Sequence, residues 1–166
     1  RSQGIEVFTA EDAPGKLGPE TIDAVTLNHV IEHVPDPIAL LEQVRGWMKP
    51  GAQIYIECPN SNALGLELFG KYWRGLEVPR HVTIPSVAGL TSALARAGFT
   101  VMRQIIPRTA RSEVWPKSFE PMPADQHEQV RQRIATTSSE TFEASDGPVL
   151  LTASVYVTFS PGVAFA

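Results

Sequence analysis

Predicted strands and helices alternate through the middle of the chain, and this alternation constrains the fold more than any other feature. Each expected strand is short and rich in β-branched or aromatic residues, and each expected helix carries apolar residues at helical spacing. The expected strands are residues 22–27, 53–57 and 99–106, and the expected helices are residues 37–49 and 86–98. Strands that alternate with helices predict an α/β fold, in which helices cover a largely parallel sheet.

Both central helices have start or stop signals. Asp36 suits the N-cap of the first helix, and Pro37 suits its first position. Ser86 is expected to cap the second helix, and Gly98 is expected to close it.

Five further segments lie outside this regular pattern. Residues 5–8 alternate and are predicted to form a strand, and residues 124–138 are predicted to form a polar helix. Residues 151–159 alternate between apolar and polar side chains, which is typical of a strand in an antiparallel position. Residues 59–85, rich in glycine and aromatic residues, and residues 107–123, interrupted by prolines, are predicted to be loops.

Length and composition narrow the possible classes of protein. The 166 residues are enough for one domain with a core. The formal charge is -4 and no basic run is present, so nucleic acid is not an expected partner. A single cysteine excludes an internal disulfide and fits a reducing compartment, which predicts a cytoplasmic protein. No apolar run is long enough to predict a transmembrane segment.

The most suggestive motif is H-x-x-E-H, formed by His29, Glu32 and His33. In zinc proteases both histidines of this motif lie on one continuous helix. Here a predicted strand precedes the motif and Pro35 follows it closely, which leaves room for about one turn and argues against a protease. At the end of a strand the three side chains could hold a divalent metal, act as general base and electrostatic support, or be structural.

Three other features allow a functional and a structural interpretation. Arg80 beside His81 could bind an anionic group or form an ion pair with a nearby carboxylate. Cys58 is interpreted as a small core residue rather than a nucleophile. Residues 65–72 (GLELFGKY) approach a phosphate-binding pattern but end in tyrosine instead of serine or threonine, so the match is interpreted as accidental.

Two longer stretches carry a family resemblance. IDAVTLNHVIEHVPDPIALLEQVRGWMKPGAQIYIECPNSN (22–62) resembles the second half of class I S-adenosylmethionine-dependent methyltransferases, in the branch near the ubiquinone-pathway O-methyltransferases. FGKYWRGLEVPRHVTIPS, followed by GLTSALARAGF, is also typical of that branch. The resemblance implies a Rossmann-like sheet of seven strands with an antiparallel last strand. The chain would supply family strands three to seven, with residues 59–85 and 107–123 as inserted substrate-side loops.

The resemblance also implies site residues. The catalytic candidates, as base or orienting groups, are His29, Glu32 and His33. The candidates for binding the cofactor S-adenosylmethionine are Asp12, Ala13, Asn28 and His29. The candidates for binding a small-molecule acceptor are Asn60, Trp73, Arg80 and His81. Some members hold a metal near the first set, but His29 stands where those members carry a carboxylate, so no metal is expected.

The chain departs from the family before residue 5. The glycine-rich loop that lets the backbone approach the cofactor, and the acidic residue that holds its ribose, should precede that position, and neither is in this sequence. We therefore expect the chain alone to bind S-adenosylmethionine weakly or not at all. The two missing strands would lie between family strands three and four, so open sheet edges and a homodimer are also expected.

Two hypotheses about function follow. In the first, the chain is part of a methyltransferase that acts on a hydroxyl or amine of a small molecule. In the second, it is a catalytically inactive methyltransferase-like module that acts in assembly or interaction.

Overall fold

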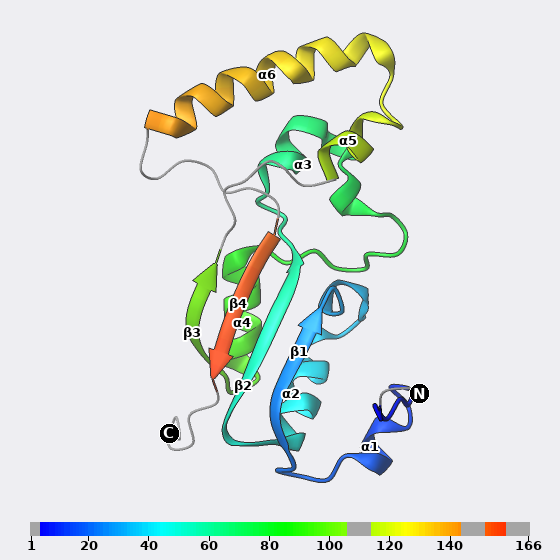
Figure 1. Ribbon diagram of the computed structural model, residues 1–166, viewed down its shortest axis with the longest axis vertical. Coiled ribbons are helices and arrows are strands. Elements are labelled where there is room, and N and C mark those ends of the chain that lie inside the picture. Colours follow the sequence, from blue (N-terminus) through cyan, green and yellow to red (C-terminus); the bar gives the residue numbers. More distant parts are fainter. Residues whose placement is uncertain (1–3, 106–113, 144–151, 159–166) are drawn as a thin grey trace.

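The computed structural model describes residues 4–105, 114–143 and 152–158. The described strands form one sheet of four, in the order β1-β2-β4-β3. Helices α2 and α4 lie behind this sheet, and α3, α5 and α6 lie beyond its upper end (Figure 1). This is the α/β, Rossmann-like architecture that the alternation predicted.

The sheet combines parallel and antiparallel pairs. β1 (Ile22–Asn28) runs parallel to β2 (Met48–Pro59). β4 (Thr152–Thr158) runs antiparallel to both β2 and β3 (Thr100–Ile105), which confirms the expectation drawn from the alternation. Leu151 and Phe159, the ends of the expected strand, lie outside the described residues. Among the described strands, β1 pairs only with β2 and β3 only with β4, so both edges are open there.

The main core lies between the sheet and its two covering helices. It is made of apolar residues of β1, β2, α2 (Pro37–Trp47) and α4 (Val87–Arg96). Leu41, Ile54, Ile56, Leu90 and Leu94 are among those with 1% or less of their surface exposed. These are the positions that the strand and helix periodicities place on one face.

The residues predicted to cap the two helices, and the glycine predicted to end the second, have the expected roles. Asp36 accepts hydrogen bonds from the backbone N–H groups of Ile38 and Ala39, at 3.1 and 3.0 Å. Ser86 accepts one from Gly89 at 3.0 Å. Gly98 follows α4 with a φ of +82°, a conformation that favours glycine.

A second apolar cluster surrounds Trp73, where the sequence predicted loops. The segment 59–85 contains helix α3 (Leu64–Phe69) and the 3-10 helices η2 (Gly70–Tyr72) and η3 (Arg74–Leu76), and residues 114–119 of the other predicted loop form α5 (Val114–Phe119). Residues 107–113 lie outside the described residues. The loop predictions were therefore wrong for these helices. Each is too short to show a period, and long-range packing against Met122 and Val130 stabilises the cluster.

Helix α6 (Ala124–Glu143) confirms the predicted polar helix and continues past its expected end. It contributes Val130 to the second cluster. No helix in the described part of the chain is long and apolar enough to cross a membrane.

The N-terminal segment differs from its prediction. Residues 5–8 form no strand, and Ile5 and Val7 are exposed. A strand needs a neighbour to satisfy its backbone, and this segment pairs with no strand of the described sheet. A short helix, α1 (Ala13–Lys16), follows instead.

Candidate functional site

The H-x-x-E-H motif forms a tight corner at the carboxyl end of β1. The His29 N–H donates to the carbonyl of Glu57 at 2.9 Å, which extends the pairing of β1 with β2. His29 then has a φ of +52°, in the left-handed region that residues other than glycine rarely adopt. This turns the chain directly into the 3-10 helix η1 (Ile31–His33). As the preceding strand and Pro35 led us to expect, the motif does not lie on one continuous helix.

His29 and Glu32 form a hydrogen-bonded pair. His29 Nδ1 lies 2.9 Å from Glu32 Oε1. Because an ionised carboxylate only accepts, the Nδ1–H of His29 donates, and its Nε2 keeps a lone pair. The Glu32 side chain is 0% exposed, whereas that of His29 is 49% exposed. The pair thus joins a buried orienting carboxylate to an imidazole that is open to an acceptor molecule.

Glu32 is also held by its backbone. Its carbonyl accepts hydrogen bonds from Val82 and Thr83, at 2.8 and 3.2 Å, and this links η1 to the segment after His81. Its second carboxylate oxygen, Oε2, is buried and has no hydrogen-bond partner among the described residues. An unpartnered buried carboxylate oxygen is costly, and it marks a place for a polar ligand or a cation.

His33 and His81 come together from different segments. Their ring centroids lie 4.8 Å apart with the planes tilted by 60°. His33 Nδ1 donates to the carbonyl of Arg80 at 3.0 Å, and His81 Nδ1 donates to that of Gly75 at 2.8 Å. His33 therefore keeps Nε2 as the atom that can accept a proton or bind a ligand, whereas Nε2 of His81 lies 3.3 Å from Glu77 Oε2.

Glu32, His33 and His81 could together hold a metal ion, although the sequence predicted none. One donor atom from each lies within 4.8 Å of the others. A histidine that binds a metal commonly donates its other ring N–H to a backbone carbonyl, as both rings do here. His29 is not part of this group, because its Nδ1 is directed to Glu32.

Asn60 and Trp73 are two buried candidates for acceptor binding, and both lie among tightly packed residues. Asn60 is 1% exposed and accepts a hydrogen bond from the backbone of Asn62, while its Nδ2 has no partner in the described structure. Trp73 is 2% exposed and belongs to the second apolar cluster. A Cβ atom added at Gly65 or Gly75 would overlap its indole ring, so both glycines are needed for this packing.

Arg80 and His81 belong to a charged network that the sequence analysis did not single out. Its centre is Glu77, which pairs with Arg74 at 2.8 Å, Arg80 at 3.0 Å and His81 at 3.3 Å. The Arg80 side chain is exposed, whereas that of His81 is 5% exposed. The spacing of Glu77 to Arg80 and His81 was visible in the sequence, but the role of Glu77 as a shared partner was not.

The four cofactor candidates fall into two places. Asn28 and His29 lie at the carboxyl end of β1, beside the pairs just described. Asp12 and Ala13 belong to the start of α1, which lies beside the amino end of β1 (Figure 1). A strand of 7 residues spans about 23 Å. The described residues thus bring together Glu32 with His29, His33 and His81 but do not assemble the four cofactor candidates.

Cys58 lies in the core next to this site. Burial raises the pKa of its thiol to about 12, and the charges of Glu32 and Glu57 add to the effect. A thiol with such a pKa is protonated at neutral pH, so it is unsuited to act as a nucleophile.

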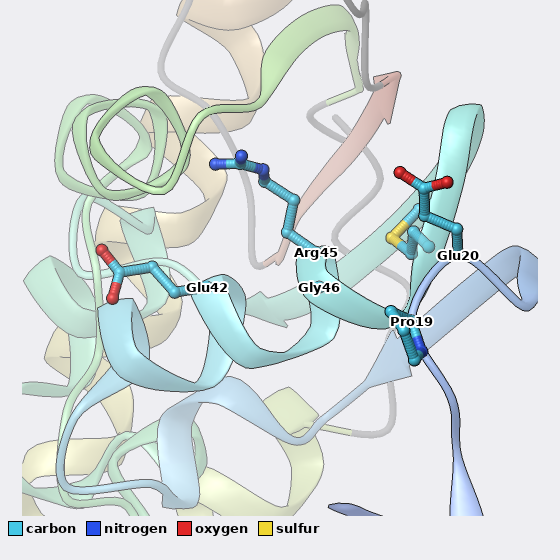
Figure 2. Close-up of a pocket in the computed structure, with 6 residues that line it drawn as sticks. Pro19, Glu20, Glu42, Arg45 and Gly46 are labelled. Carbon is cyan, nitrogen blue, oxygen red and sulfur yellow. The ribbon is translucent and has the colours of Figure 1, made fainter.

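One surface hollow is remote from these residues. It encloses about 600 Å³ around the carboxyl end of α2, lined by Glu20, Glu42 and Arg45 (Figure 2). A smaller apolar groove of about 230 Å³ lies behind η1, where Ile31 and Leu90 form part of its wall. Neither hollow is lined by His29, His33 or His81.

Residues 3–104 match a family model described as a methyltransferase domain. The chain belongs to the class I S-adenosylmethionine-dependent methyltransferases.

Curated relatives agree over shorter stretches. Ubiquinone biosynthesis O-methyltransferase of Pseudomonas syringae pv. tomato is 39% identical over 55 residues, 33% of this chain and 23% of that protein. Its counterpart in Aeromonas salmonicida is 34% identical over 64 residues, 36% of this chain and 26% of that protein. These matches span about a quarter of the relatives' length.

Solved structures show the same fold at low sequence identity. A chain of the complex between the Haloferax volcanii Trm112 methyltransferase activator and a methyltransferase has a TM-score of 0.59 at 17% identity, over 90% of this chain and 58% of that chain. A SAM-dependent methyltransferase from Archaeoglobus fulgidus has a TM-score of 0.54 at 22% identity, over 91% of this chain and 65% of that chain. The methyltransferase sheet is thus recognisable in this chain.

Proposed function

We propose that this methyltransferase chain carries the acceptor side of an active site that methylates a hydroxyl or amine of a small molecule. The single observation that supports it is the His29–Glu32 pair, with 2.9 Å between His29 Nδ1 and Glu32 Oε1. When bound, S-adenosylmethionine would supply the methyl group. The chain's own residues would bind the acceptor and remove its proton.

In this proposal His29 is the general base. Glu32 fixes the tautomer, so His29 Nε2 faces the acceptor with its lone pair. As Nε2 takes the proton, the ring becomes cationic, and the buried carboxylate of Glu32 stabilises that charge. The positive φ of His29 orients the ring, a strained conformation of the kind that clusters at functional sites.

The acceptor would lie against the segment 59–85, in keeping with its expected role as a substrate-side insertion. Asn60 offers a buried amide group without a partner in the described structure, and Arg80 offers an exposed cation. His33 and His81, each with a donor atom within 4.8 Å of one of Glu32, would serve as orienting groups.

The test is methyl transfer from radiolabelled S-adenosylmethionine to a panel of small phenols, alcohols and amines. If a longer natural chain contains this sequence, that chain is assayed beside it. We expect His29→Ala to lower turnover about 10²- to 10⁴-fold, the usual contribution of a general base. His127→Ala is the matched control, because His127 packs against Phe119 and bonds the Met122 carbonyl, away from His29. Equal turnover in the His29 variant and the native chain would exclude this role for His29.

An assembly role is the second candidate, supported by the open edge of β1 in the described sheet. Separation of Asp12 and Ala13 from His29 also fits a chain that needs a partner to complete its cofactor side. Light scattering after size exclusion would test it. A dimer that binds S-adenosylhomocysteine would support completion between copies, and a monomer at all concentrations would exclude a homodimer.

A further inference from the structure

The turn that carries Arg80 and His81 depends on one carboxylate. Glu77 Oε1 accepts from the guanidinium groups of Arg74 and Arg80, and Glu77 Oε2 lies 3.3 Å from His81 Nε2. Its backbone carbonyl accepts hydrogen bonds from the N–H groups of Arg80 at 2.8 Å and His81 at 3.4 Å. The carboxylate and the backbone carbonyl of Glu77 therefore both stabilise the turn 77–81.

The backbone of Glu77 indicates that its position is fixed. It has φ and ψ of +38° and +43°, in the left-handed region, although it is not a glycine. Such a conformation is unfavourable for a residue other than glycine and persists where surrounding contacts determine it. Here those contacts are the two arginines and His81, and the Glu77 side chain is only 21% exposed.

The turn 77–81 also determines which ring nitrogen of His33 carries the proton. The carbonyl of Arg80 takes the Nδ1–H of His33, and the ring of His81 packs against the ring of His33. The Nε2 lone pair of His33 is thus presented at the site only while this turn keeps its shape.

We propose that Glu77 is a positioning residue of the active site, which acts through the turn 77–81 to hold His33 in its Nδ1–H tautomer. The inference rests on the proposed function for its effect on turnover, although its structural part can be measured without turnover. It also changes the interpretation of Arg80: its carbonyl orients His33, and its guanidinium is bound to Glu77.

The experiment is long-range proton–nitrogen NMR of the histidine side chains in the full chain, at alkaline pH where neutral imidazole dominates. In the native chain we expect His33 as Nδ1–H and His127 as Nε2–H, since His33 Nδ1 faces the Arg80 carbonyl at 3.0 Å and His127 Nε2 faces the Met122 carbonyl at 2.9 Å. Glu77→Gln is expected to convert His33 to a mixture of tautomers and to leave His127 unchanged. Acceptor turnover should fall by up to about 10²-fold in kcat, from misplaced groups.

Glu67→Gln is the matched control, because Glu67 also pairs with an arginine, Arg133, at 3.3 Å but lies on α3. It should change neither tautomer nor turnover. If Glu77→Gln fails to fold by circular dichroism, Glu77→Asp gives the same test, since it keeps the charge with one methylene less reach.

Retention of the Nδ1–H tautomer of His33 in the folded Glu77 variant would overturn the proposal, as would a tautomer change that leaves turnover intact. If the native chain transfers no methyl group, the proposed function fails. The tautomer of His33 then still decides whether Glu77 positions this histidine.

Discussion

The sheet core and the cluster around Trp73 are held together in different ways. The sheet core repeats one pattern, in which apolar residues of β2 alternate and those of α2 and α4 recur at helical spacing. The second cluster has no repeat: a single tryptophan lies between Gly65 and Gly75 and contacts helices far along the chain. The difference teaches that local periodicity is enough to specify the first region, whereas the second depends on one shape-specific contact.

Truncation of Trp73 should give the largest contrast between the regions. Trp73→Ala is expected to cost about 3–5 kcal/mol, because it removes a large buried ring. The loss should appear as faster hydrogen exchange in α3, with β2 and α4 still protected.

Leu94→Ala, a change of about 2–5 kcal/mol in the sheet core, is the comparison variant. It should accelerate exchange in both regions, because the second cluster is attached to the end of β2. If Trp73→Ala instead accelerates hydrogen exchange throughout the sheet, the two regions unfold as one cooperative unit. That result would contradict the distinction between them.

A smaller effect is expected from a single added methyl group beside Trp73. A Cβ at Gly75 would lie 2.3 Å from the indole ring, so Gly75→Ala should destabilise the second cluster by about 1–3 kcal/mol through overpacking. Thermal unfolding followed by tryptophan fluorescence measures this change.

Gly46→Ala in α2 is the control, because a Cβ there meets nothing within 4 Å. It should stabilise the helix by about 0.5–1 kcal/mol. A loss of stability there equal to that of Gly75→Ala would show that shape specificity is not confined to the second cluster.

The smallest effect concerns the ionisation of Cys58 in the sheet core. Its pKa is about 12 in the folded chain against an ordinary value of 9.0, so the unfolded chain loses this proton first. Stability is therefore kept below pH 9 and falls as the pH rises toward 12. By pH 10 the folded chain has lost about 1 kcal/mol of its free energy of unfolding through this ionisation.

Urea unfolding of the native chain and of Cys58→Ala, each at pH 8 and pH 10, isolates this contribution from that of other titrating groups. The native chain should lose about 1 kcal/mol more than the variant between the two pH values. Identical losses would mean that the thiol is not held protonated by its surroundings in the core.

Part of the candidate site could be predicted because it follows from strand order. Asn28, His29 and Asn60 stand where two neighbouring parallel strands end, and the carboxyl ends of such strands meet at one edge. The sequence could not place Glu77, since its role arises from a turn that folds back onto η1. The sequence grouped Asp12 with His29, but the structure separates them, because the segment expected as a strand at residues 5–8 pairs with no strand of the described sheet.

The sequence by itself determined the alternation of strands and helices, their caps, the antiparallel last strand and the family. These depend on neighbours a few residues apart, where backbone geometry and side-chain spacing decide the outcome. Only the tertiary structure decided that His29 pairs with Glu32, that His33 meets His81, and that Trp73 builds a second cluster. Those contacts follow from a left-handed corner and from long-range packing, which no local pattern encodes.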